Sequence, residues 1–118
     1  MSEMTYYQKA MISKDKPIVW LSAAVKSPPF SKGARLEAGF LLRKLQRGQM
    51  PEMPHSRPML VIGAKCHELR VIDIDKTWRI IYRIDADAIV ILDVFSKKTR
   101  ATPLLVIDRS RRRLSCST

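Results

Sequence analysis

Apolar residues recur at helical spacing between residues 31 and 48. Positions that are three, four, seven or eight residues apart share one face of a helix, and such a stripe predicts a buried face. Ser31 precedes the stripe as a typical N-cap, and Gly48 follows it as a typical C-terminal stop. The residues of the stripe are Ala34, Ala38, Leu41, Leu42 and Leu45.

Short runs rich in branched and aromatic residues predict strands in most of the remaining chain. A first strand is expected at residues 16–21. Four more strands are expected at residues 59–62, 66–72, 77–84 and 88–95. Short polar turns separate the later strands, so antiparallel hairpins are the natural arrangement.

The segments between these elements complete the prediction. A brief helical turn is expected from Ser22 to Lys26, a proline-containing loop at residues 48–58, and a final helix at residues 103–114 with a basic C-terminal end. One domain is expected at residues 16–114, between a flexible N-terminus at residues 1–15 and a tail at residues 115–118. The expected fold class is α+β, with the N-terminal helices packed on one face of a twisted, mainly antiparallel sheet, and a C-terminal helix.

Strand alternation divides the predicted hairpins into two faces. A turn at residues 73–76 pairs Ile72 with Thr77 and places Arg70 opposite Arg79. A turn at residues 86–87 places Arg79 opposite Val94. The expected polar face collects Glu68, Arg70, Arg79, Arg83, Ser96 and Lys98. The expected core face carries Leu69, Trp78, Ile80, Tyr82, Ile84, Ile89, Ile91 and Phe95. Three apolar residues break this division and fall on the polar face: Val90, Leu92 and Val94.

Arginines on a sheet face need an explanation, because like charges opposite one another destabilise a strand pair. They are either ordinary solvated residues or binding groups for something negative. Guanidinium groups bind phosphate with two parallel hydrogen bonds, so the cluster favours phosphate recognition.

The composition favours the interpretation that these arginines bind something negative. The chain has 118 residues, with 22 Lys and Arg against 11 Asp and Glu, and a net charge of +11. Such a field attracts polyanions, although solubility alone is the simpler alternative. Cys66 and Cys116 share no motif and are expected to be free thiols in a reducing compartment. The chain starts without a signal-peptide pattern and holds no apolar run of about 18 residues, so a cytoplasmic protein without a membrane partner is expected.

The sequence gives little support for metal binding. His55 and His67 are far apart and lack the spacing of metal ligands, so no metal site is expected. The segment Arg109–Leu114 is either a nucleic-acid contact or a solvated helix end.

Residues 16–103 resemble the RelE/HigB superfamily of bacterial toxins, in its phage-derived toxin-like branch. The resemblance rests on the order and spacing of "PIVWL", "RPMLVIGAKCHELRV", "TWRIIYRIDADAIVILDVFSKKT" and the "TP" at residues 102–103. It implies a microbial-ribonuclease-like fold. It also implies a toxin of a type II toxin–antitoxin system that cleaves mRNA on the ribosome.

The resemblance also implies roles for single residues in a reaction without metal or cofactor, in which the ribose 2′-hydroxyl attacks the adjacent phosphate. Arg79 matches an arginine that contacts the scissile phosphate, and Lys98 matches the basic residue after the last strand. Glu68 stands where RelE has a catalytic lysine and would act as a general base, assisted by Arg70. An aliphatic segment near Leu104 replaces the tyrosine that RelE places in the final helix.

The implied partners are a cognate antitoxin protein, mRNA on the ribosome and rRNA, with a homodimer or a toxin–antitoxin hetero-oligomer as the assembly. The alternative is a non-catalytic basic module of the same fold that binds nucleic acid or an antitoxin. The residues expected to bind nucleic acid are Arg83, Lys97, Arg100, Arg111, Arg112 and Arg113.

Overall fold

The structure is a computed structural model that describes residues 15–21, 29–51, 55–97 and 102–117. The predicted helical turn at residues 22–26 and almost all of the predicted N-terminal segment lie outside these ranges. The elements, in chain order, are β1 (Ile18–Trp20), α3 (Lys32–Gln46), β2 (Ser56–Pro58), β3 (Cys66–Ile72), β4 (Thr77–Ile84), β5 (Ile89–Lys97) and α4 (Leu104–Ser117).

Helix α3 follows the prediction closely. The Ser31 Oγ accepts a hydrogen bond from the backbone N–H of Ala34 at 3.1 Å, which satisfies one of the free donors at the helix start. Gly48 after the helix has φ of 83°, a conformation that costs glycine little. All five residues of the predicted apolar stripe are buried.

The five strands form one mixed sheet in the order β1-β5-β4-β3-β2. Strands β2 to β5 pair antiparallel, whereas β1 pairs parallel with β5 at the edge. The predicted hairpin register is confirmed, since Ile72 pairs with Thr77 and Arg70 with Arg79. The final helix also forms, and it runs to Ser117.

The strand predicted at residues 59–62 is wrong. The strand is instead β2, which lies inside the predicted proline loop and pairs Arg57 with Glu68. An edge strand tolerates Pro58 because it has a neighbour on one side only. After β2 the chain turns, with the N–H of Ile62 donating to the carbonyl of Met59 at 3.0 Å.

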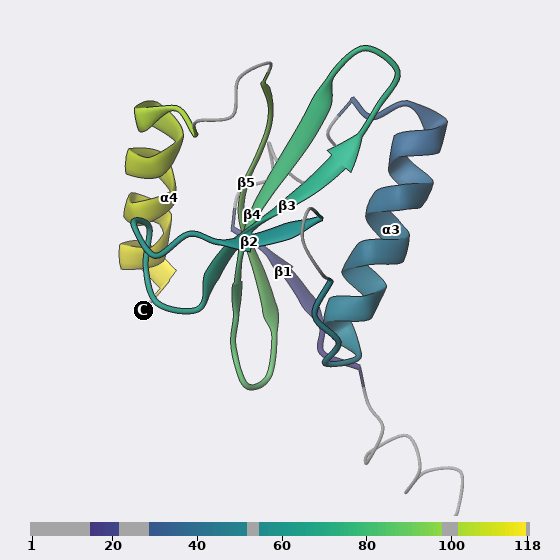
Figure 1. The fold of residues 1–118 in the computed structure, drawn as a ribbon. Coiled ribbons are helices and arrows are strands. Elements are labelled where there is room, and N and C mark those ends of the chain that lie inside the picture. Colours follow the sequence, from purple (N-terminus) through teal and green to yellow (C-terminus); the bar gives the residue numbers. More distant parts are fainter. Residues whose placement is uncertain (1–14, 22–28, 52–54, 98–101, 118) are drawn as a thin grey trace, which may run out of the picture.

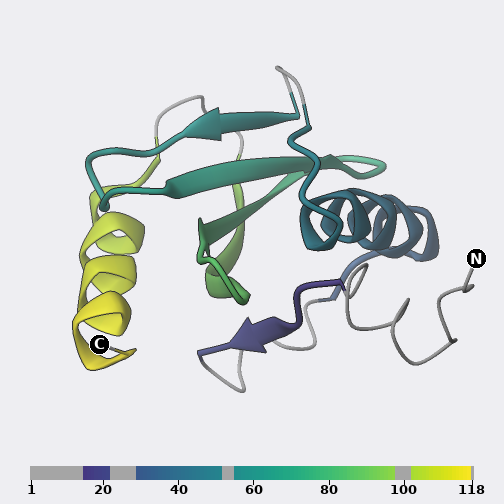
Figure 2. The same cartoon turned by 90° about the horizontal axis from the view of Figure 1, so that it is seen from below.

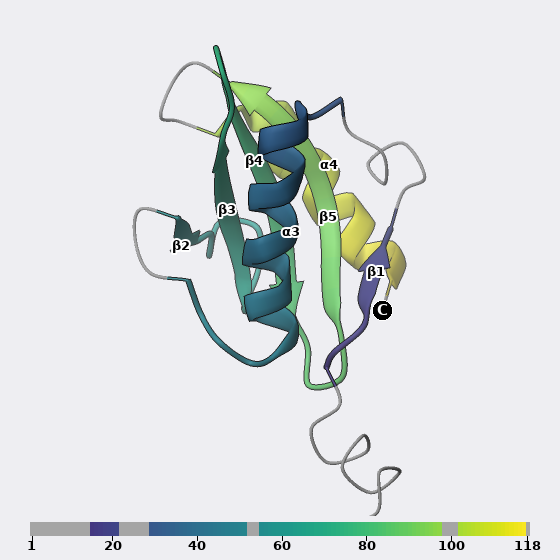
Figure 3. The ribbon, with the colours of Figure 1, turned by 90° about the vertical axis from the view of Figure 1, so that its right-hand side faces the viewer.

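The expectation that the helices share one face of the sheet is also wrong. In the described part of the chain one helix, α3, precedes the hairpins, and it lies across one face of the sheet while α4 lies behind the other (Figures 1 and 3). Each helix covers its own core: Leu69, Ile80 and Ile91 pack with α3, and Val90 and Leu92 pack with α4. Val90 and Leu92, two of the three apolar residues on the predicted polar face, therefore belong to a second core. Figure 2 shows the two helices on opposite sides of the strands.

Because β5 contains a bulge, the pairing of its C-terminal half differs from the predicted register. Ile81 pairs with Asp93 and Tyr82 pairs with Ile91, so Leu92 is an extra residue. Beyond the bulge the faces exchange: Arg79 lies opposite Phe95 instead of Val94, and Ser96 pairs with Trp78 on the α3 side. Phe95 accordingly packs with the α4 core and Val94 with the α3 core.

Candidate functional site

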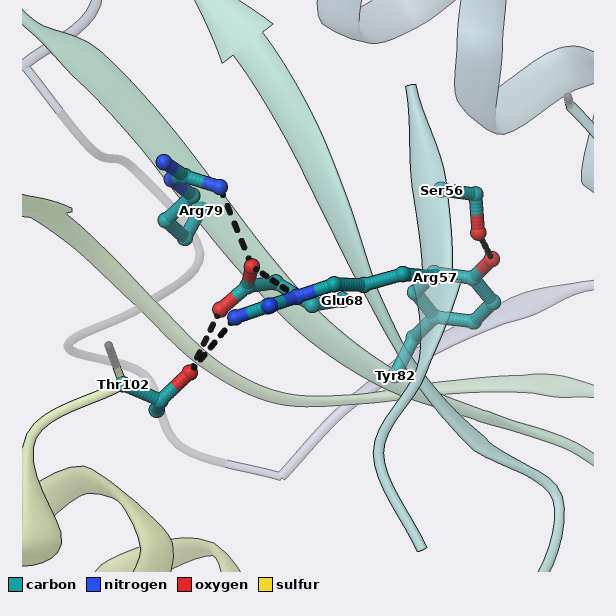
Figure 4. Close-up of polar contacts among 6 residues, drawn as sticks. All are labelled: Ser56, Arg57, Glu68, Arg79, Tyr82 and Thr102. Carbon is teal, nitrogen blue, oxygen red and sulfur yellow. Dashed lines mark hydrogen bonds and ion pairs between the residues drawn. The ribbon is translucent and has the colours of Figure 1, made fainter. Parts of the chain in front are cut away.

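Four polar residues meet on the α4 side of the sheet, where Glu68 is the centre of the group (Figure 4). Its Oε1 accepts hydrogen bonds from Arg57 Nε and Arg79 Nη1, each at 3.1 Å. Its Oε2 accepts one from the Thr102 hydroxyl at 2.9 Å, and Arg57 Nη2 donates to the same hydroxyl at 3.3 Å. We call Arg57, Glu68, Arg79 and Thr102 the Glu68 cluster.

Sheet register and the chain before α4 bring the cluster together. Arg57 is the direct pairing partner of Glu68 across β2 and β3. Arg79 on β4 lies two residue pairs further along the β3–β4 ladder, opposite Arg70 and on the same face as Glu68. Thr102 lies just before the first turn of α4. The cluster is closed to solvent at its centre, because Glu68 is 1% exposed and Arg79 is 5% exposed.

Among the described residues, the charges of this region do not balance. The guanidinium groups of Arg57 and Arg79 contact the Glu68 carboxylate, and the charge of Arg70 acts on Arg79 as well. Burial lowers the pKa of Arg79, Glu68 opposes this effect, and the positive charges of Arg70 and Arg57 reinforce it. The Nε atoms of Arg70 and Arg79 are buried and have no hydrogen-bond partner among the described residues. Excess positive charge with free donors is the arrangement that an anionic ligand would complete.

The structure places the other predicted site residues in different surroundings. Arg83 lies on β4 and forms a double ion pair with Asp85, with contacts of 2.7 and 3.0 Å. Lys97 is the last residue of β5, in register with Thr77. Lys98 and Arg100 lie outside the described residues.

Helix α4 carries the predicted arginine run. Contacts to Asp93 that were not predicted from the sequence hold this helix on the sheet. Asp93 is buried on β5 and accepts from Arg109 Nε at 2.8 Å, and its other oxygen lies 3.3 Å from Arg113 Nη1. Arg113 also donates to the carbonyl of Leu92. Arg113 thus fixes α4 to the sheet, whereas Arg111 and Arg112 are exposed and available to a partner.

Arg57, Thr102 and Asp93 are polar residues whose roles were not expected. The signal for Asp93 is its position inside the apolar run "IVILDVF", because a carboxylate in a buried strand requires partners. The sequence offers no comparable signal for Arg57, because its role depends on β2 pairing with β3.

The described part of the chain contains no group of three or more His, Cys, Asp or Glu residues that could hold a metal ion. Among the described residues no helix is both long and apolar enough to cross a membrane. The side chains of the Glu68 cluster offer guanidinium groups that bind and orient an anion, and a carboxylate that holds them in place.

Comparison with known proteins identifies the family. A family model described as "Phage derived protein Gp49-like (DUF891)" matches residues 29–115, a range that includes the Glu68 cluster and most of α4. No curated protein and no solved structure matches the chain. The chain therefore belongs to the phage-derived Gp49-like family, which is related to toxin–antitoxin systems.

Proposed function

We propose that this protein is the toxin of a type II toxin–antitoxin system, and that it acts as a metal-independent, ribosome-dependent mRNA endoribonuclease with a RelE-like fold. Membership of the Gp49-like family supports the toxin assignment. The α+β architecture, with a sheet between α3 and α4, is compatible with the microbial-ribonuclease-like fold that the sequence suggested.

The observation that carries the proposal is the excess positive charge around Glu68. Like charges of Arg70 and Arg79 face each other across β3 and β4, at a cost to the strand pair. One carboxylate offsets part of this charge, and the buried Nε donors lack acceptors in the described part of the chain. An RNA phosphate would supply the missing negative charge.

In this proposal the side chains have distinct roles. Arg70 is half-buried and borders the cluster, so it is the group that reaches the phosphate first. Arg79 stabilises the charge that develops on the phosphate, and Lys98, the next residue in sequence after β5, adds a further cation. Glu68 accepts from three donors, so it orients Arg57 and Arg79, and taking the 2′-hydroxyl proton would require one of those contacts to open. Positioned donors of this kind contribute about 10²–10³ in rate each.

The remaining basic residues are suited to contacts with the phosphates of mRNA and of ribosomal RNA. Arg111 and Arg112 project from α4 into solvent and supply contacts to rRNA or mRNA. The cognate antitoxin would be an acidic segment, because the net charge of +11 favours a partner of opposite sign.

One observation favours a second candidate, a non-catalytic module that binds RNA or an antitoxin. Glu68 and Arg79 are almost completely buried and paired with each other, which is also what a purely structural ion pair requires. In that case the protein would bind a polyanion without breaking it.

The test is induced expression in a bacterial host, with primer extension on a reporter message. Wild type is compared with Arg70→Gln and Arg79→Lys, which remove or reshape one guanidinium each. Arg43→Gln is the matched control, because Arg43 is exposed on α3 and away from the cluster. Circular dichroism of the purified variants establishes that each one folds.

Discrete cuts in wild type and the control, with at least about tenfold fewer cuts in both cluster variants, are expected from the loss of one positioned donor. Growth arrest should follow the same order. Undiminished cutting by folded Arg70→Gln and Arg79→Lys would remove the site assignment. RNA binding by a folded wild type that never cuts would establish the second candidate.

A further inference from the structure

A second basic pocket lies at the end of the sheet where β4 turns into β5. It has a volume of about 320 Å³ and is lined by Lys16, Lys65, His67, Ile84, Asp85 and Ala86. His67 and Glu68 are successive residues of β3, so their side chains project to opposite faces of the sheet. The pocket is therefore separate from the Glu68 cluster, and we call it the His67 pocket.

The imidazole of His67 is held in one orientation by two contacts. Its ring stacks on Tyr82, with 5.5 Å between ring centroids and 19° between planes. Its Nδ1 lies 3.3 Å from the backbone carbonyl of Lys65. A carbonyl only accepts, so Nδ1 donates to it, and the protonated ring presents a second N–H at Nε2 that can donate to a phosphate oxygen.

Two lysines supply the charge of the pocket. Lys16 is held by its surroundings: its Nζ donates to the carbonyl of Asp85 at 2.9 Å, and its backbone N–H donates to the carbonyl of Gln46 at 2.8 Å. Lys65 is exposed and has φ of 63°, a conformation that is uncommon for residues other than glycine. Strained backbone of this kind concentrates at functional sites.

The acidic residue of the pocket does not cancel this charge. Both carboxylate oxygens of Asp85 are engaged by Arg83, at 2.7 and 3.0 Å. Among the described residues that line the pocket, no other acidic side chain offsets the two ammonium groups, which lie beside the imidazole and the apolar side chain of Ile84. Two positive charges match the two negative charges of a terminal phosphate better than the single charge of a backbone phosphodiester.

We propose that the His67 pocket binds a terminal phosphate monoester, carried by a free nucleotide or by the end of an RNA strand. Lys16 and Lys65 provide the charge, and His67 provides a directed ring nitrogen. The proposal does not depend on RNA cleavage at the Glu68 cluster, because binding to this pocket is measured without any cutting.

The experiment is a titration of the full-length chain with inorganic phosphate, followed by two-dimensional amide NMR. Amide shifts centred on Lys65, His67 and Asp85 are expected. Lys65→Asn removes one charge and suits the backbone, because asparagine adopts positive φ more readily than most residues. His67→Phe keeps an aromatic ring on Tyr82 and removes both ring nitrogens.

Each variant should weaken phosphate binding by about threefold to fivefold, the size expected for one exposed charged contact. Lys32→Asn is the matched control, because Lys32 is an exposed lysine at the start of α3, and it should leave binding unchanged. Equal weakening by Lys32→Asn, or shifts spread over all basic residues, would show attraction by the net charge and overturn the proposal.

Further titrations identify the source of the phosphate. Adenosine monophosphate is compared with a short RNA that carries a 5′-phosphate and with the same RNA lacking it. Tighter binding of the phosphorylated RNA, lost in Lys65→Asn, indicates an RNA end. Equal binding of the nucleotide and the phosphorylated RNA indicates that the phosphate group alone is recognised. Equal binding of both RNAs, with and without the phosphate, would contradict recognition of a terminal phosphate.

Discussion

At the scale of single residues, the most consequential feature is a carboxylate shared by several donors inside the protein. Glu68 is 1% exposed, and its two oxygens accept from Arg57, Arg79 and Thr102. A buried charge is tolerated only when it is paired and hydrogen-bonded. The same contacts that could orient arginines toward RNA therefore also hold β2, β3, β4 and the start of α4 together.

Replacing Glu68 with methionine should be strongly destabilising, because it leaves the buried Arg79 without its acceptor. We expect the free energy of unfolding to fall by about 3–5 kcal/mol, as when one partner of a buried pair is removed. The double variant Glu68→Met/Arg79→Met removes both charges and should lose less than Glu68→Met alone. Urea unfolding followed by circular dichroism measures both, and a double variant that loses the sum of the single losses would contradict the coupling.

Sequence alone predicted which of these residues share a face, but it did not predict their burial. Strand alternation and the turn at residues 73–76 were enough to place Glu68, Arg70 and Arg79 together, because both signals are local. Burial depends on α4 crossing that face and on β2 adding Arg57. Both are tertiary events that no local pattern in the arginine-rich hairpin encodes.

At the scale of the elements, a buried hydrogen bond helps to hold the edge strand β2 in place. The hydroxyl groups of Ser56 on β2 and Tyr82 on β4 lie 2.7 Å apart (Figure 4). Burial raises the pKa of Tyr82 to about 12, with the contact to Ser56 partly opposing the shift. A strand of three residues has few other ways to hold its place, so this contact helps to position Arg57 as well.

The pH dependence of stability should reveal the burial of the Tyr82 hydroxyl. An unfolded tyrosine ionises near pH 10, whereas folded Tyr82 keeps its proton until about pH 12. The folded state therefore binds more protons in this interval, and stability is lost as the pH rises through it. The full effect of a shift of this size is about 3 kcal/mol.

Tyr82→Phe should abolish this alkaline loss and should cost about 1 kcal/mol at neutral pH, because the Ser56 hydroxyl loses its partner. Thermal unfolding of wild type and variant between neutral pH and about pH 12 measures the difference. Parallel stability curves for the two proteins would contradict the assignment.

Elements with strong local signals were predictable, whereas those fixed by partners were not. Helix α3 has a cap, a stop and a five-residue stripe, so its position followed from sequence. Strand β2 is short, ends in Pro58 and is defined by its pairing with β3. The bulge at Leu92 likewise leaves no mark on an apolar run, and missing it moved Phe95 to the wrong face.

At the scale of the whole molecule, the net charge of +11 should dominate the affinity for RNA. If about five cations neutralise RNA phosphates, affinity should fall by about 10²-fold between about 50 and about 200 mM salt. Fluorescence anisotropy of a labelled single strand measures the slope. Arg111→Gln/Arg112→Gln should reduce the slope by about one to two contacts, since both side chains are exposed on α4. A slope unchanged by this double variant would place the RNA elsewhere.

The parallel pairing of β1 with β5 has a consequence for the order in which the molecule assembles. Ile18 pairs with Ile89, about seventy residues further along the chain, and α3 lies between them. Closing so long a loop costs more entropy than closing a hairpin, so β1 joins the sheet after β3, β4 and β5 have paired. During synthesis β1 must wait for β5, the last strand of the sheet, and a chain that ends before β5 leaves both β1 and the edge of β4 without their partner and open to other proteins.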